Sequence, residues 1–269
     1  MYDYIKIGSW RSDSVLDLHV MDWDVPLLAP ADYGSAQIPG RMTALRDAQR
    51  NFKPATITIN MAITGDDEKD ILRRHRAISK TLWDADHLIL SDLPDHHFRG
   101  HVSEVVATDV VEEWLRFRVK FMANPPCRLR VLGVSAGWIP SQALPIPEQI
   151  TENNAGHNLA LQGSGTVTGS VAIHDGTSPY PPEVYMLLIG SWDSLTIGGS
   201  GGLTIPGLPV TSAVWLDAEA MQVYDKVEGI RTPVPNISGD YAAIGRDPLL
   251  TFSGVNPNLT AHILVIERS

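Results

Sequence analysis

Cysteine is almost absent from this chain, because its 269 residues include only Cys127. A single cysteine excludes an internal disulfide and is typical of a protein made in a reducing cytoplasm. The sequence also lacks any run of 18 apolar residues, so we expect no transmembrane helix and no membrane insertion. The first twenty residues lack the basic and apolar segments of a signal peptide, so no signal peptide is expected.

Basic residues are scarce in the second half of the chain. Residues 1–130 carry 17 basic and 19 acidic side chains, whereas residues 131–269 carry 4 and 12. Glycine shifts the other way, from 5 residues to 17. These compositions predict two domains, at residues 1–130 and 148–269, with a proline-containing linker at residues 131–147. The net charge of −10 argues against a protein that reads nucleic-acid sequence, since such proteins need a basic surface.

The clearest structural pattern lies in residues 54–127. Apolar residues alternate along residues 57–63, which indicates a strand with one buried face. Residues 71–82 then place apolar side chains at three- and four-residue spacing, as expected of an amphipathic helix. Asp70 and Arg74 stand four residues apart and are predicted to pair on the surface of this helix.

Three further strands are predicted after this helix. Residues 87–90 form a short apolar strand, and residues 114–121 alternate apolar with mostly basic residues. Residues 97–106 are the expected antiparallel partner of residues 114–121. One helix over an antiparallel sheet makes an α+β N-terminal domain within a mainly β protein.

Residues 148–269 have the pattern of a β-sandwich. Short apolar segments recur between Gly, Pro and Asn turns, and no segment shows helical periodicity. Residues 217–220 are the expected loop of a hairpin. The predicted strands are residues 158–161, 166–174, 183–189, 194–197, 213–216, 221–224, 249–252 and 259–267.

Residues 1–53 are predicted to contain an early strand around residues 15–23, followed by loops. The segment after this strand is too polar to pack a core alone, so it is either disordered or an arm that lies on another subunit. Its turn signal consists of Ile38, Pro39, Gly40 and Arg41.

Two short motifs match catalytic or phosphate-binding patterns only formally. Residues 198–202 fit the G-x-S-x-G nucleophile pattern, but residues 203–206 indicate a strand where that motif needs a helix. Residues 163–165 lack the Lys and the following helix of a P-loop. Flexible turns are the favoured interpretation of both, so no catalytic residue is predicted.

Potential metal ligands are densest between residues 92 and 101, where the set is Asp92, Asp95, His96, His97 and His101. Neither the H-E-x-x-H spacing nor a paired C-x-x-C is present. Adjacent histidines in a strand point to opposite faces, which divides the set. Turn and strand-edge positions are therefore favoured, and no metal site or cofactor is predicted.

Three basic residues lie at alternate positions of the last predicted N-terminal strand, namely Arg116, Arg118 and Lys120. An ordinary solvated face and a contact with an acidic partner subunit remain comparable interpretations.

The order of these segments resembles the distal tail protein family (Dit) of long, non-contractile-tailed bacteriophages. The resemblance includes the proline-glycine-arginine turn at residues 38–41, a strand ending before Gly65, and one helix with Trp83 at its end. Residues 88–98 contain an Asp-x-Pro and aromatic run of the kind found in the family, and the basic-apolar strand runs into residues 121–126.

The C-terminal half adds further similarity. Residues 213–217 and 222–225 are similar to a strand pair of the family, and residues 252–268 to its last hairpin. One departure is that Cys127 follows the prolines at positions 125 and 126, whereas the family often has Cys-x-Pro.

The resemblance implies a structural, non-enzymatic protein of the virion tail tip, synthesised in the cytoplasm of the host bacterium. The N-terminal domain would resemble tail-tube proteins, a β-sandwich or split barrel with one helix, and would build a homo-hexameric ring around the DNA channel. The C-terminal domain would be a galectin-like β-sandwich. Implied partners are the tail tube protein, the tail hub or fibre protein and receptor-binding proteins, while DNA passes without specific binding. The implied ring and partner interface comprises residues 38–41 with the three basic residues named above.

Two other functions are weighed against this interpretation. The C-terminal sandwich could make the chain a carbohydrate-binding protein, with Trp192 or Trp215 as candidate glycan contacts, although aromatic residues in a sandwich more often belong to the core. A tail-tip glycosidase would need a pair of carboxylates such as Asp22 with Asp24. Acidic residues of this kind are more often solvated, so the glycosidase is the least favoured alternative.

Overall fold

The computed structural model describes residues 4–15, 17–26, 31–36, 45–111, 113–134, 138–140, 144–175, 181–199, 201–207, 212–227 and 230–269, with backbone alone for residues 31–36, 45–52, 111, 212 and 227. Contacts divide the chain into a first unit, Met1–Leu129, and a second unit, Arg130–Ser269. Residues 131–147, expected as a linker, group with the second unit.

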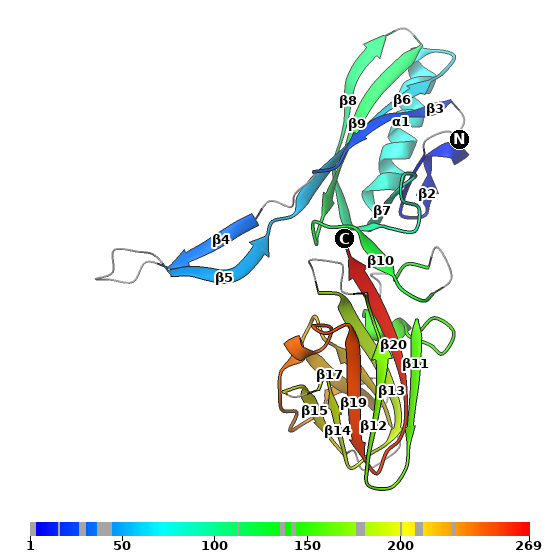
Figure 1. The fold of residues 1–269 in the computed structure, drawn as a ribbon. Helices are drawn as coiled ribbons and strands as arrows, with labels where there is room; N and C mark the ends of the chain where they lie inside the picture. Colours follow the sequence, from blue (N-terminus) through cyan, green and yellow to red (C-terminus); the bar gives the residue numbers. More distant parts are fainter. Residues whose placement is uncertain are drawn as a thin grey trace. The chain divides into compact units, whose positions relative to one another are not determined.

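The first unit combines antiparallel strands with one α-helix, as the sequence predicts (Figure 1). Its strands pair in the order β2-β1-β7-β8-β9-β6-β3. The elements are β1 (Ile5–Ile7), β2 (Trp10–Arg11), η1 (Ser12–Ser14), β3 (Leu18–Asp24), β4 (Ala31–Ala36), β5 (Leu45–Phe52), β6 (Ala55–Thr64), α1 (Glu68–Trp83), β7 (His87–Leu90), β8 (Phe98–Val111) and β9 (Trp114–Ala123).

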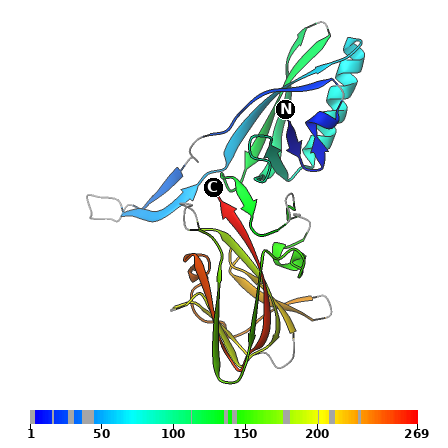
Figure 2. The ribbon, with the colours of Figure 1, turned by 45° about the vertical axis from the view of Figure 1, so that its right-hand side comes forward.

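The core of the first unit lies between α1 and one face of this sheet (Figure 2). Alternate residues of β6 and β9 point to this face and are fully buried, which the period-2 pattern predicts. Ile71, Ile78 and Leu82 of α1 are buried on the same core. The basic residues of β9 point to the opposite face of the sheet, which is not part of this core.

The ends of α1 follow the local signals of the sequence. The Asp67 carboxylate accepts a hydrogen bond of 2.7 Å from the Asp70 backbone N–H and caps the helix N-terminus. The predicted pair is confirmed, because Arg74 Nε lies 2.6 Å from Asp70 Oδ2. These contacts fix the start of α1 directly after β6.

Strands β4 and β5 pair with each other in a separate two-stranded sheet. The sequence predicts a disordered segment or an arm here and does not predict this pairing. The four turn residues Ile38, Pro39, Gly40 and Arg41 lie outside the described residues.

The second unit contains two further antiparallel sheets, in the orders β10-β20-β13-β16-β17-β18, with β11 also on β20, and β12-β19-β14-β15. Figure 1 shows the strands of this unit in two layers. The elements are β10 (Leu129–Val131), η2 (Ile146–Gln149), β11 (His157–Gln162), β12 (Thr166–Ala172), β13 (Glu183–Ser191), β14 (Ser194–Ile197), β15 (Leu203–Pro206), β16 (Ser212–Asp217), β17 (Gln222–Val227), β18 (Ile230–Pro233), η3 (Tyr241–Ala243), β19 (Leu249–Val255) and β20 (Asn258–Arg268).

Most predicted strands of the second unit are confirmed, and the predicted loop at residues 217–220 joins β16 to β17. The strand at residues 203–206 is also confirmed as β15, whereas the short strands β10 and β18 are not predicted. The inner faces of the two layers form one core that includes Met186, Phe252 and Ile263. No helix in the described part of the chain is long and apolar enough to cross a membrane.

Candidate functional site

The outer face of the first unit's sheet carries the predicted basic residues. Arg116 and Arg118 are exposed on β9 and Lys120 is half-buried, while the residues between them point into the core. The backbone alternation therefore brings the three side chains to one face, as expected.

Acidic residues of neighbouring strands accompany this basic row. Lys120 Nζ lies 2.6 Å from Glu104 Oε2 of β8, and Asp109 of the same strand is opposite Arg116. On the other side, Arg118 Nε donates at 3.5 Å to Asn60 Oδ1, which is a long and weak contact. The face is thus a basic row with acidic neighbours, and each exposed ion pair adds little to stability.

The acidic neighbours continue to the edge strand β3. The Asn60 side-chain amide donates to Asp22 Oδ1 at 2.5 Å, and Asp24 is two residues further along the same strand. Residues of three strands therefore bring opposite charges together across the face. Reading β9 alone predicts the basic row but does not place its acidic neighbours.

Apolar side chains are exposed near the β8–β9 hairpin of the same sheet. Val106 and Val110 of β8 and Trp114 of β9 are each between 44% and 48% exposed. The His19 and Trp114 rings lie 5.8 Å apart, and on the intervening strand β6 His19 is opposite Ala62 and Trp114 opposite Thr64. This end of the sheet offers apolar surface beside the charged row.

Besides the two-residue edge strand β2, strands β3 and β8 of this sheet have edges without a strand partner in the described part of the chain. Edge strand β3 pairs with β6 alone. Strand β8 pairs with β7 only at Phe98 and Arg99, so its remaining residues are paired only on the β9 side. Backbone groups along such edges are available to a further strand.

The two candidate glycan-binding tryptophans lie in different environments. Trp192 is 4% exposed, belongs to the core, and donates its indole N–H to the Pro206 carbonyl at 3.2 Å. Trp215 is half-buried and stacks on Tyr224, with ring centroids 6.0 Å apart. Lys226 Nζ lies 5.7 Å from the Trp215 ring centroid.

Tyr224 also belongs to a polar cluster centred on Glu148 of η2. Both Lys226 Nζ and Arg231 Nε lie 2.5 Å from the Glu148 carboxylate, which is 5% exposed. Burial acts against the charged form, but these two hydrogen bonds lower the pKa of Glu148 below its ordinary value. Burial and the Glu148 carboxylate raise the pKa of Tyr224 to about 12. The cluster holds η2 against β17 and β18.

The potential metal ligands of residues 92–101 and the G-x-S-x-G pattern have structural roles in the described part of the chain. Arg128 Nη2 lies 2.7 Å from Asp92, and His96 lies 2.8 Å from Asp95, while His97 is buried. No group of three metal-ligating side chains occurs among the described residues. The glycines of the G-x-S-x-G pattern join the antiparallel strands β14 and β15, so no helix follows it.

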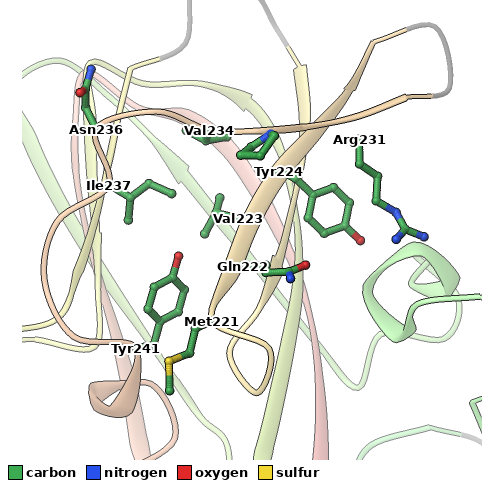
Figure 3. Close-up of a pocket in the computed structure, with 10 residues that line it drawn as sticks. Met221, Gln222, Val223, Tyr224, Arg231, Val234, Asn236, Ile237 and Tyr241 are labelled. Atoms are coloured by element: carbon green, nitrogen blue, oxygen red, sulfur yellow. The ribbon is translucent and has the colours of Figure 1, made fainter.

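A pocket of about 490 Å³ opens between the β17–β18 hairpin and the segment that leads to η3 (Figure 3). Val223, Val234 and Ile237 supply its apolar walls, and Tyr241 lies across from them. Sequence reasoning missed this site because its residues belong to separate turns and strands without a common motif.

These features define a mainly β protein of two units, the first with one helix on an antiparallel sheet and the second a β-sandwich. No family profile and no curated protein matches its sequence. Among solved structures, the chain is similar to the Dit protein of phage SPP1, with a TM-score of 0.58 and 11% identity over 100% of both chains. The fold of the SPP1 Dit protein is therefore also the fold of this chain.

A second similar structure belongs to the baseplate of phage P2, in its activated conformation with Ca. Its TM-score is 0.46 at 8% identity, over 100% of this chain and 99% of the other. The SPP1 protein is described as a paradigm of the hub adsorption apparatus in phages that infect Gram-positive bacteria.

Proposed function

We propose that this chain is a structural protein of a phage tail tip, where it forms a homo-hexameric ring as part of the baseplate hub. The observation that carries the proposal is the likeness of the whole chain to the SPP1 Dit protein. The ring would join the tail tube protein to the tail hub or fibre protein and hold receptor-binding proteins in the virion.

The first unit is the ring-forming part in this proposal. The partnerless edges of β3 and β8 lie at different places on one sheet, so head-to-tail contacts between copies could cover both. The exposed apolar side chains near the β8–β9 hairpin, with Arg116 and Arg118, supply apolar and charged contacts for such an interface.

The charge of the chain suits a channel that DNA crosses without binding. Each copy has a net charge of −10, so a ring of six would carry roughly −60. No part of the proposal requires an enzymatic step or a cofactor.

Native mass tests the proposal directly. Light scattering after size exclusion should give a mass near six times 29.4 kDa, and negative-stain images should show closed rings. A monomer whose mass does not change with concentration would overturn the ring.

The segment of residues 38–52, which includes β5, has its own test. We propose that it contacts a neighbouring copy, so deletion of residues 40–50 should convert the hexamer to smaller species while the melting transition of the subunit remains. An intact hexamer after this deletion would remove these residues from the interface.

A further inference from the structure

Strand β12 (Thr166–Ala172) lies at the edge of the smaller sheet of the second unit. It pairs with β19 over its whole length, and no other strand pairs with it in the described part of the chain. The register of this pairing has no shift between Thr166, opposite Val255, and Ala172, opposite Leu249. One long side of β12 is therefore open to a further strand.

Hydrogen bonds at the two ends of β12 show which backbone groups face this open side. The Asn256 N–H donates to the Gly165 carbonyl at 2.8 Å, and the Ile173 N–H donates to the Pro248 carbonyl at 2.9 Å. Hydrogen-bonded positions alternate along an antiparallel pair, so the odd-numbered residues of β12 face β19. The even-numbered residues direct their N–H and C=O groups to the open side, and these are Thr166, Thr168, Ser170 and Ala172.

Strand β12 lacks the usual protections of a sheet edge. Its seven residues include no charged residue and no proline, and its pairing with β19 has no bulge. The edges at the other side of the sandwich are protected, because β15 is bridged to Ser238 and β18 carries Arg231 and Pro233. In a chain with a net charge of −10, an uncharged edge is a place where a second copy can approach with little repulsion.

The sequence of β12 is nearly symmetrical about Gly169. Thr168 and Ser170 flank this glycine, and Val167 and Val171 lie one residue further out. Two copies of the strand can therefore pair antiparallel across a two-fold axis that passes through Gly169. Such a pair places Thr168 of one copy opposite Ser170 of the other, and Val167 opposite Val171.

The backbone groups on the open side fit this symmetrical register. When the axis passes through an odd-numbered residue, every even-numbered residue is opposite an even-numbered residue of the other copy. The outward N–H and C=O groups of Thr168 then meet those of Ser170, and the groups of Thr166 meet those of Ala172. A register shifted by one residue would place outward groups opposite groups that already bond to β19.

The side chains of β12 fit the same register. Val167 and Val171 are half-buried and pack against the sandwich core, and pairing across the axis would bury their remaining surface against each other. Thr168 and Ser170 are exposed on the outer face of the sheet. Each hydroxyl both donates and accepts a hydrogen bond, so hydroxyls that meet across a two-fold axis are complementary to one another.

We propose that β12 binds β12 of a second copy of this chain, antiparallel and centred on Gly169. The four-stranded sheets of two second units then join into one continuous sheet, and the open edge of each is covered. This contact goes beyond the proposed function, because it uses no residue of the proposed ring interface.

Disulfide trapping of the full chain tests the register. A mixture of Thr168→Cys and Ser170→Cys chains should cross-link at least about tenfold faster than either variant alone, because opposite residues have Cα atoms about 5.5 Å apart and like residues are diagonal at about 7–8 Å. A mixture of Thr166→Cys and Ser170→Cys chains is the matched control, because these positions are also diagonal. Native Cys127 is buried and common to all samples, so wild type gives the background.

A backbone variant tests the hydrogen bonds. Thr168→Pro removes an N–H that faces the open side and leaves the bonds to β19, and it should weaken association at least about tenfold. Thr168→Ala keeps the N–H and should weaken association by no more than about threefold. Sedimentation across a concentration series measures association as mass above that of the basic particle, whether this is one chain or one ring.

Equal cross-linking rates in the Thr168 and Ser170 mixture and in the single variants would overturn the proposal, and would leave the edge to a strand of a different protein. Fastest cross-linking in the Thr166 and Ser170 mixture, or equal association of Thr168→Pro and Thr168→Ala, would overturn it as well. Melting temperatures identify a Thr168→Pro chain that fails to fold, and the cross-linking rates then decide. Cross-linking should persist in the chain that lacks residues 40–50, so this proposal and the ring fail separately.

Discussion

Arg268, at the end of β20, donates a hydrogen bond of 3.0 Å to the carboxylate of Glu183, at the start of β13. Glu183 is 2% exposed at its side chain and also accepts from the Tyr185 hydroxyl at 2.8 Å. Burial alone would lower the pKa of Arg268, but the carboxylates of Glu183 and Glu219 outweigh it and raise that pKa. The pair therefore stabilises the two neighbouring central strands of the sandwich as charged groups.

Substitution of Arg268 should lower the stability of the second unit. Arg268→Met leaves the Glu183 carboxylate buried without its cation, and we expect a loss of about 3 kcal/mol in the free energy of unfolding. Urea unfolding measures the loss. The matched control is Arg246→Met, because Arg246 is exposed and lies 3.8 Å from Asp240. That variant should change stability by less than about 0.5 kcal/mol, and equal losses in the two variants would contradict the prediction.

The parts of the fold that depend on local spacing could be predicted from sequence. The Asp67 cap and the Asp70–Arg74 pair depend on residues within one helical turn. The acidic partners of β9 could not be placed in the same way. Strand β8 has register shifts between Val102 and Glu104 and again before Asp109, and period-2 alternation does not locate such bulges.

The sites of the second unit required the tertiary structure. Sequence cannot distinguish a core tryptophan such as Trp192 from an exposed one, because both suit a strand. The Tyr241 pocket was missed for a related reason. Its walls come from β17, from the turn after β18 and from η3, and these segments meet only when the sandwich closes.

Glu148 should make the stability of the second unit depend on pH. Its pKa is lowered in the folded chain, so its contribution is complete above the ordinary value of 4.5 and is lost as pH falls through the lowered value. Glu148→Gln should reduce stability by about 1–3 kcal/mol at pH 7, because it weakens the bonds to Lys226 and Arg231. The difference from wild type should shrink below pH 4.5 in urea titrations. Exposed Glu152→Gln is the control, and a difference that persists at low pH would refute this role.

Gly100 should tolerate no side chain. A Cβ at this position of β8 would lie 1.9 Å from the Met122 carbonyl oxygen of β9, and backbone cannot move aside without disrupting the strand pair. We expect Gly100→Ala to cost about 3 kcal/mol or to leave the first unit unfolded. Circular dichroism and urea unfolding report the change. Ser103→Ala, at an exposed position of the same strand, should stay within about 1 kcal/mol of wild type.

The stability of the first unit should decrease in mild acid because of His75. Its ring packs edge-on against Phe117 at 5.1 Å, and burial lowers its pKa from 6.5. The unfolded chain therefore takes up the proton first as pH falls below 6.5, so stability decreases toward the lowered folded pKa. His75→Leu keeps an apolar contact with Phe117 and should flatten this part of the stability profile. If the profile of His75→Leu matched wild type between pH 7 and about 5, His75 would not be the titrating group.

The basic row of β9 should contribute to association between copies if the first unit forms the ring. Arg116→Glu with Arg118→Glu places two acids beside Asp109 and Asp22, and the added repulsion should weaken assembly at least about tenfold. Light scattering across a concentration series gives the shift. Arg76→Glu with Lys80→Glu makes the same charge change on the exposed side of α1 and should leave the mass unchanged. If both double variants keep the wild-type mass, the basic row is an ordinary solvated face, and the ring contacts must come from the strand edges and the apolar hairpin instead.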